Sequence, residues 1–184
     1  MAFYHGSPIG GLIHLKPFLS NHQKPYIYFA SNPLVALLYA VKPLPKPFGY
    51  YPYGFDKNGN VVYSEHYENA FFDIYKGKTG YLYECDTLEN LENPTEINCA
   101  YASEEPVKVD RVTEISDIYD WYMEQKEKGL FRIIPLQEVS EKELKFGENY
   151  LIEMIGLYDL HNNPEHPMSV FIRDHFQKVW EREA

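Results

Sequence analysis

Residues 24–41 read KPYIYFASNPLVALLYAV, and this stretch decides the fold. Its first part, Lys24 to Ala30, is rich in aromatic and β-branched residues and predicts a strand. Asn32 can accept the first free amides of a helix as its N-cap, and Pro33 fits the first helical turn. The leucines that follow lie along one apolar face. We therefore expect a strand that is followed almost at once by a helix over about Pro33 to Val41.

The rest of the chain carries similar signals on both sides of this stretch. Strand patterns occur at Ala2–His5, Val61–Tyr63, Tyr81–Asp86, Ile97–Ala102, Pro106–Thr113 and Leu130–Pro135. Helical spacing occurs at Ser64–Tyr75, Ser116–Lys128, Glu148–Leu160 and Met168–Glu183. Asn58-Gly59 predicts a hairpin turn, and four prolines predict an irregular loop over 42–55. We expect an α+β fold with a sheet core over 1–115 and a helical C-terminal extension over 116–184 that packs on the core.

Composition excludes several classes of protein. The chain has 184 residues, of which 45% are hydrophobic and 24% charged, so a disordered chain is excluded. Its apolar runs are far shorter than the roughly 20 residues of a membrane span, and the first residues lack the pattern of a signal peptide. Cys85 and Cys99 stand alone, which indicates reduced thiols. We expect a cytoplasmic protein that does not associate with a membrane.

Charge is distributed unevenly along the chain. The net charge of −10 argues against a generic nucleic-acid surface. No Asp or Glu precedes Asp56, however, while four lysines do, among them Lys16 and Lys24. This pattern is typical of a local site for a small anionic ligand, although a chance distribution of acids would produce it as well.

Two short motifs place ring side chains at strand ends. The first strand reads Phe3-Tyr4-His5-Gly6-Ser7, in which a glycine after the histidine allows the backbone to approach a ligand closely. The second strand reads Tyr28-Phe29-Ala30, and Tyr39 follows eleven positions after Tyr28 on the predicted helix. A histidine at a strand end is often only structural, but the two tyrosines could face one pocket.

In this order and spacing, the chain resembles the ADP-ribosyltransferase superfamily, most closely its His-Tyr-Glu branch, which the poly(ADP-ribose) polymerases typify. The resemblance covers about Met1 to Thr113 and implies a split antiparallel β-sheet with flanking helices. It also implies NAD as the substrate, with His5 bonded to the ribose 2′-hydroxyl, the Gly6 backbone holding the nicotinamide amide, and Tyr28 and Tyr39 on either side of the nicotinamide ring. Ser7 and Ala30 complete the implied NAD-binding set.

The implied triad of His5, Tyr28 and a glutamate needs its carboxylate, for which the resemblance favours Glu105. This residue is expected to open a strand, and Asp110 follows it by five positions. Strand alternation sends Glu104 and Glu105 to opposite faces, so Glu104 is the rival for the same place. The chain departs from the family at Ala36, where a serine usually bonds the nicotinamide amide, and in the long segment that follows Glu105.

The resemblance implies an enzyme that cleaves the nicotinamide–ribose bond and transfers ADP-ribose to an unknown protein, nucleic-acid, small-molecule or water acceptor. A carboxylate beside the ribose would stabilise the oxocarbenium-like charge that develops there. Lysines such as Lys16 and Lys24 would meet the pyrophosphate. The main alternative is a non-catalytic module that binds NAD, ADP-ribose or a protein, and an RNA 2′-phosphotransferase is a weaker alternative because the chain has few arginines. We expect no metal site.

Overall fold

The computed structural model describes residues 2–19, 24–41, 52–95 and 97–182. The chain forms two compact units, the first from residues 1–41 and 75–128 and the second from residues 42–74 and 129–184. This division differs from the expected boundary at residue 115. The segment after residue 115 contributes a helix to the first unit, and the middle of the chain joins the C-terminal helices in the second.

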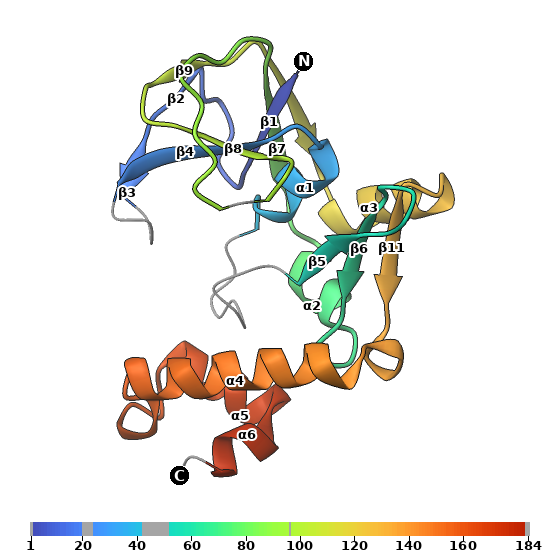
Figure 1. Ribbon diagram of the computed structural model, residues 1–184, viewed down its shortest axis with the longest axis vertical. Coiled ribbons are helices and arrows are strands. Elements are labelled where there is room, and N and C mark those ends of the chain that lie inside the picture. Colours follow the sequence, from blue (N-terminus) through green and yellow to red (C-terminus); the bar gives the residue numbers. More distant parts are fainter. Residues whose placement is uncertain (1, 20–23, 42–51, 96, 183–184) are drawn as a thin grey trace. The chain divides into compact units, whose positions relative to one another are not determined.

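The first unit is built on an antiparallel sheet (Figure 1). Its strands follow the order β10-β7-β1-β4-β3, and β8 also pairs with β4. Their bounds are β1 Phe3–Ser7, β3 Phe18–Leu19, β4 Pro25–Ala30, β7 Gly80–Cys85, β8 Ala100–Ser103 and β10 Arg111–Ile115. A separate two-stranded ladder joins β2 His14–Leu15 to β9 Val107–Lys108. The fold class is therefore α+β with an antiparallel sheet, as expected.

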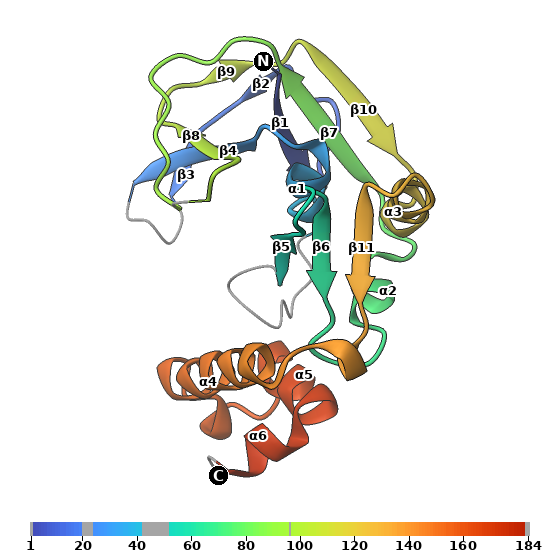
Figure 2. The same ribbon diagram turned by 45° about the vertical axis from the view of Figure 1, so that its right-hand side comes forward.

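Helix α1, Pro33–Leu38, follows β4 as the sequence predicts. The Asn32 side chain accepts the Leu34 amide hydrogen at 2.9 Å, so the N-cap is confirmed. All five helical residues after Pro33 are buried. Figure 2 shows α1 against β1 and β7, and the buried hydroxyls of Tyr75 and Tyr122 donate to the α1 carbonyls of Leu38 and Leu34. Two tyrosines from other elements thus hold both ends of this short helix.

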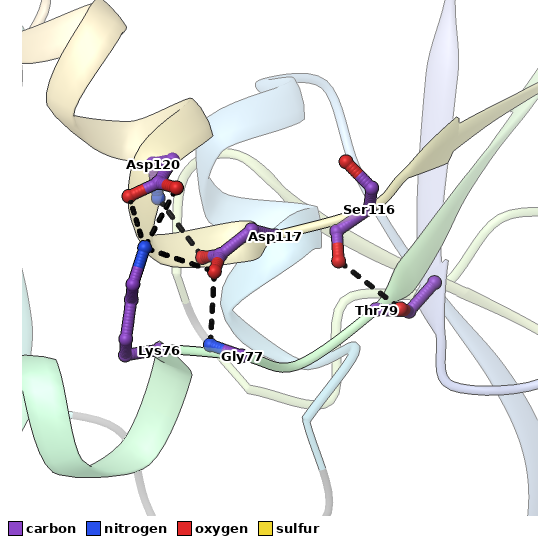
Figure 3. Close-up of polar contacts among 6 residues, drawn as sticks. All are labelled: Lys76, Gly77, Thr79, Ser116, Asp117 and Asp120. Atoms are coloured by element: carbon purple, nitrogen blue, oxygen red, sulfur yellow. Dashed lines mark hydrogen bonds and ion pairs between the residues drawn. The ribbon is translucent and has the colours of Figure 1, made fainter.

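The second helix of the first unit, α3 Ile118–Glu127, has a densely bonded N-terminus (Figure 3). The Asp117 carboxylate caps it and accepts the amide hydrogens of Asp120 at 3.1 Å and of Gly77 at 3.0 Å. Lys76 Nζ lies 3.1 Å from Asp117 and 2.6 Å from Asp120. Burial alone would raise the pKa of Asp117, but the bonds from the Asp120 and Gly77 amides and from Lys76 lower it overall. The cap therefore ties α3 to the segment that leads into β7.

The second unit contains a three-stranded sheet of order β11-β6-β5. Its strands are β5 Tyr53–Phe55, β6 Val61–Ser64 and β11 Phe131–Ile134. The hairpin expected at Asn58-Gly59 is confirmed, because β5 and β6 pair antiparallel and Gly59 has a φ of +83°. The Asp56 carboxylate accepts the backbone amide hydrogens of Asn58 and Asn60 and so closes the turn. Residues 42–51 of the expected loop lie outside the described residues.

Helices form the remainder of the second unit. They are α2 Ala70–Tyr75, whose last residue belongs to the first unit, α4 Glu141–Leu157, α5 Pro167–His175 and α6 Gln177–Arg182, with 3-10 turns at Leu136–Glu138 and Leu160–Asn162. Their core contains Leu151, Leu160 and Ile172, each with no exposed surface, and Tyr67 packs into it. His66 is also buried, and its Nε2 lies 3.7 Å from a carboxylate oxygen of Glu143 on α4.

Several predicted bounds are corrected by the structure. Helix α4 begins at Glu141 rather than Glu148, because Ser140 caps it by accepting the Glu143 amide hydrogen. The single helix expected over 168–183 is broken at Phe176, whose backbone leaves helical geometry. No described helix is long and apolar enough to cross a membrane.

Candidate functional site

The predicted site residues all lie in the first unit. Three of them, His5, Gly6 and Tyr28, lie where β1 and β4 diverge. The β1–β4 ladder contains one residue pair, Tyr4 opposite Ala30. Strand β1 then continues beside β7 as far as Ser7, which lies opposite Tyr81. Strand β4 is paired on its other edge by β8 from Ile27 to Ala30. We call the divergence, with His5, Gly6 and Tyr28 at its edges, the candidate site.

The imidazole of His5 bridges this divergence. Its Nδ1 lies 2.8 Å from the carbonyl oxygen of Tyr28. A carbonyl oxygen can only accept a hydrogen bond, so Nδ1 must carry the proton and Nε2 is the acceptor nitrogen of the neutral ring. The ring also lies against Phe29, at 6.0 Å between centroids, and against Tyr83, at 6.5 Å. The histidine is thus held in one tautomer and one orientation, and its Nε2 can accept a hydrogen bond from a hydroxyl.

Gly6 serves a purpose that the sequence motif did not reveal. A Cβ at this position would lie 2.1 Å from the carbonyl oxygen of Ala36 and 3.1 Å from the backbone nitrogen of Ala40. The absence of a side chain therefore lets β1 approach the backbone of α1. The expected role of the Gly6 backbone in holding an amide remains a prediction, but packing alone already requires glycine here.

The other predicted binding residues surround this junction. Tyr28 is half-buried, and its ring packs edge-on against Tyr26, with centroids 5.8 Å apart. Ala30 is buried in the sheet. Tyr39 ends α1 as its C-cap and keeps 38% of its surface exposed. The Ser7 hydroxyl is buried and accepts the amide hydrogen of Ile9 at 3.1 Å. The placing of a nicotinamide ring between Tyr28 and Tyr39 remains a prediction.

The sequence predicts that Glu105 opens a strand, and this prediction is wrong. Glu104 and Glu105 lie in a bend after β8, because the segment turns there to join β9. Both are exposed. The Ser103 hydroxyl accepts the Glu105 amide hydrogen and donates to the Glu105 carbonyl, each at 3.1 Å, so the bend is fixed by a side chain at the end of β8.

The two glutamates differ in their charge partners. Glu104 accepts a hydrogen bond from Lys24 at 2.8 Å, and the bond, together with the charge of Glu104, raises the pKa of Lys24. Lys24 also lies 3.6 Å from Glu92. Among the described residues, Glu105 forms no ion pair. Glu104 therefore has a cationic partner, whereas Glu105 has none among the residues that the structure describes.

Sequence reasoning missed the role of Glu92. The Tyr26 hydroxyl donates to the Glu92 carboxylate at 2.5 Å, which lowers the pKa of that carboxyl. Glu92 lies opposite Ala102, which in turn lies opposite Tyr28. Residues directly opposite each other in antiparallel strands point to the same face, so Glu92 and Tyr28 share one. No local pattern could have identified this contact, since Tyr26 and Glu92 are 66 positions apart.

The sequence predicts that Lys24 could bind a pyrophosphate. In the structure, Lys24 forms ion pairs with Glu92 and Glu104 instead. Lys16 is exposed and makes no ion pair with any residue that the structure describes. Arg111 is held by Glu84 and Asp86 through four hydrogen bonds of 2.5 to 3.1 Å. Of these three cations, Lys16 is the one left to meet an anionic ligand.

Among the residues that the structure describes, no group of three or more His, Cys, Asp or Glu side chains could hold a metal ion. The imidazole of His5 is thus held by the backbone of Tyr28, while Glu104 and Glu105 lie in the bend after β8. Contact of these glutamates with a ligand at His5 remains a prediction. Compared with known proteins, the chain matches no family model, no curated protein and no solved structure.

Proposed function

We propose that the chain is an NAD-dependent ADP-ribosyltransferase that cleaves the bond between nicotinamide and ribose and passes ADP-ribose to an acceptor or to water. The observation that carries the proposal is the hydrogen bond between His5 and the Tyr28 carbonyl across the divergence of β1 and β4. It joins two motifs that are 23 positions apart and on which the resemblance rests. With Nδ1 bonded to this carbonyl, Nε2 is the acceptor nitrogen of the neutral ring, which is the nitrogen that the proposed ribose contact requires.

The reaction requires three groups: a hydrogen-bond acceptor for a ribose hydroxyl, an aromatic ring that stacks on the nicotinamide leaving group, and a negative charge beside the anomeric carbon. In the proposal, His5 Nε2 accepts the hydrogen bond of a ribose hydroxyl, and Tyr28 stacks against the nicotinamide ring. Stacking of this kind contributes about 1 kcal/mol beyond the burial of the ring surface. When the glycosidic bond breaks, its electron pair leaves with neutral nicotinamide and the ribose carries the positive charge. The acceptor then bonds to the anomeric carbon and loses a proton.

The carboxylate best suited to this cation is Glu105. A negative charge already compensated by a lysine stabilises a nearby cation less, which disfavours Glu104. Glu105 is therefore the proposed catalytic carboxylate, which stabilises the ribose cation. Lys16 is the proposed contact for the pyrophosphate. The alternative of a non-catalytic NAD-binding module would retain His5 and Tyr28 but would not depend on Glu105 for any activity.

Nicotinamide release from NAD tests the proposal. We expect the wild-type protein to release nicotinamide, and Glu105→Gln to lower the turnover on the order of 100-fold while NAD affinity is retained, because an electrostatic contact at the developing charge is lost. Glu104→Gln is the matched control and should leave turnover within about twofold.

The outcomes separate the candidates. His5→Ala should weaken both NAD binding and release, since the ribose loses its acceptor. Saturable binding of NAD by the wild-type protein without any release would favour the binding module. A wild-type protein that neither binds NAD nor releases nicotinamide would refute both the proposal and the NAD-binding form of the alternative, and would leave a module that binds ADP-ribose or a protein.

A further inference from the structure

Residues 8–13 follow β1 directly and connect the candidate site to β2; we call them the rim segment. This segment has no regular secondary structure, yet its backbone is held at several points by side chains of the sheet. We propose that Tyr83 is a positioning residue that fixes the rim segment as a rigid wall of the candidate site and thereby sets the affinity for NAD. The inference rests on the function proposed above.

Tyr83 binds the rim segment at two points, Ile9 and Leu12. This residue of β7 has no exposed surface. Its hydroxyl donates to the Ile9 carbonyl at 2.7 Å and accepts the Leu12 amide hydrogen at 3.2 Å. One phenol hydroxyl, from a residue more than 70 positions away in the chain, thus donates one hydrogen bond to the rim segment and accepts another from it.

Two further contacts restrict the segment between these points. Ser7 accepts the amide hydrogen of Ile9 at 3.1 Å. Gly10 lies against the ring of Tyr81, where a Cβ would come within 2.6 Å of the ring carbon Cζ. Gly11 has a φ of +74°, which favours glycine. The segment therefore has one defined path over the sheet, even though it belongs to no strand.

The same tyrosine also touches the imidazole of the site. Tyr83 lies opposite His5 in the β1–β7 ladder, and the two ring centroids are 6.5 Å apart. Side chains opposite each other in such a ladder point to the same face. The Tyr83 ring thus lies near the proposed ribose-binding ring, and its hydroxyl binds the rim segment, so the positions of the two are coupled.

The composition of the rim segment indicates what it contributes. Residues 8–13 read PIGGLI and contain no charged or titratable side chain. Ile9 and Ile13 keep 60% and 75% of their surface exposed, although the backbone that carries them is anchored. A segment of this kind can offer a ligand apolar contact and backbone hydrogen bonds but no proton and no charge. Its effect should therefore fall on binding rather than on the chemical step.

Tyr83→Phe tests the inference, because it keeps the buried ring and removes both hydrogen bonds. We expect the KM for NAD in nicotinamide release to rise about fivefold to tenfold while kcat stays within about twofold, which corresponds to the loss of about 1 kcal/mol of binding. Hydrogen exchange of the Leu12 amide should accelerate by at least about tenfold, since its acceptor is gone.

Tyr122→Phe is the matched control. It removes another buried tyrosine hydroxyl that donates to a backbone carbonyl, that of Leu34 on α1, and leaves the rim segment intact. It should destabilise the protein without moving KM or the Leu12 exchange rate. If Tyr83→Phe fails to fold, Ile9→Ala, at an exposed position, provides the second variant and should raise KM with kcat unchanged.

Each result decides for or against the inference. An unchanged KM in both Tyr83→Phe and Ile9→Ala, with a wild-type protein that turns over NAD normally, would overturn this inference alone. An equal rise of KM in Tyr122→Phe would show a general effect of lost stability and would overturn it too. A wild-type protein without NAD turnover would instead refute the proposed function, and the positioning role for NAD with it.

Discussion

Replacement of Gly6 by alanine is the most informative perturbation of the fold around the site. The added Cβ would lie 2.1 Å from the Ala36 carbonyl oxygen and 2.9 Å from the carbonyl carbon. Ordinary van der Waals contact begins at 3.4 Å, so β1 or α1 must move by about 1.3 Å. Both obstacles are backbone atoms of a buried helix and neither can rotate away. Overpacking costs about 1 to 3 kcal/mol, and this geometry places Gly6→Ala at about 3 kcal/mol.

Urea unfolding followed by circular dichroism measures this effect. For a slope of about 2 to 3 kcal/mol/M, a loss of about 3 kcal/mol lowers the midpoint by about 1 to 1.5 M. Gly156→Ala is the control. Gly156 lies in α4, and its Cβ would meet no atom within 4 Å beyond the neighbouring backbone of its own helix. Alanine favours helix by about 1 kcal/mol, so the midpoint should rise. A Gly6→Ala protein as stable as the wild type would refute the close packing of β1 on α1.

Three other predictions concern titratable groups. Asp117→Ala should cost about 1 to 2 kcal/mol in urea unfolding at pH 7 through loss of the α3 cap. Because the folded pKa of Asp117 lies below its unfolded value near 4, the difference in stability between variant and wild type should shrink as the pH falls below about 4, and a difference that grows instead would contradict this. Burial lowers the pKa of His66, so the stability of the folded protein should fall as the pH drops below about 6.5. In a pH series of urea midpoints, His66→Gln should show a smaller fall over this range than the wild type. An equal fall in both proteins would count against this prediction. Burial raises the pKa of Cys85 to about 11, and Cys99 is less buried. Iodoacetamide at pH 8 should therefore label Cys99 well before Cys85 in the folded protein, as measured by mass spectrometry of peptides. Labelling in the reverse order would be inconsistent with the burial of Cys85.

The fold was predictable from sequence where local chemistry decides it. Asn32 and Pro33 mark the start of α1, and Asn58-Gly59 marks the β5–β6 hairpin. Boundaries set by tertiary pairing were not predictable. The segment expected as one strand over 106–113 is divided, because β9 pairs with β2 whereas β10 pairs with β7. The pairing partner of each half lies far away in the chain and leaves no mark on the local pattern.

The candidate site shows the same limit. The motifs around His5 and Tyr28 could be found because each is contiguous, and their hydrogen bond brings the two together. The lysine partner of Glu104 could not be foreseen, since Lys24 and Glu104 are 80 positions apart. Nor does any periodicity indicate that the Tyr83 hydroxyl binds the segment after β1. Contacts of this kind depend on which strands become neighbours, and one strand's sequence does not encode that.

The histidine side-chain ¹H–¹⁵N spectrum, recorded during titration with NAD, tests the central claim most directly. Because the Tyr28 carbonyl accepts from Nδ1, the free protein should show His5 protonated at Nδ1 when its ring is neutral. Added NAD should then shift the Nε2 resonance of His5, and the shift should saturate. A His5 ring protonated at Nε2 alone, or one that stays unchanged while NAD binds, would contradict the account.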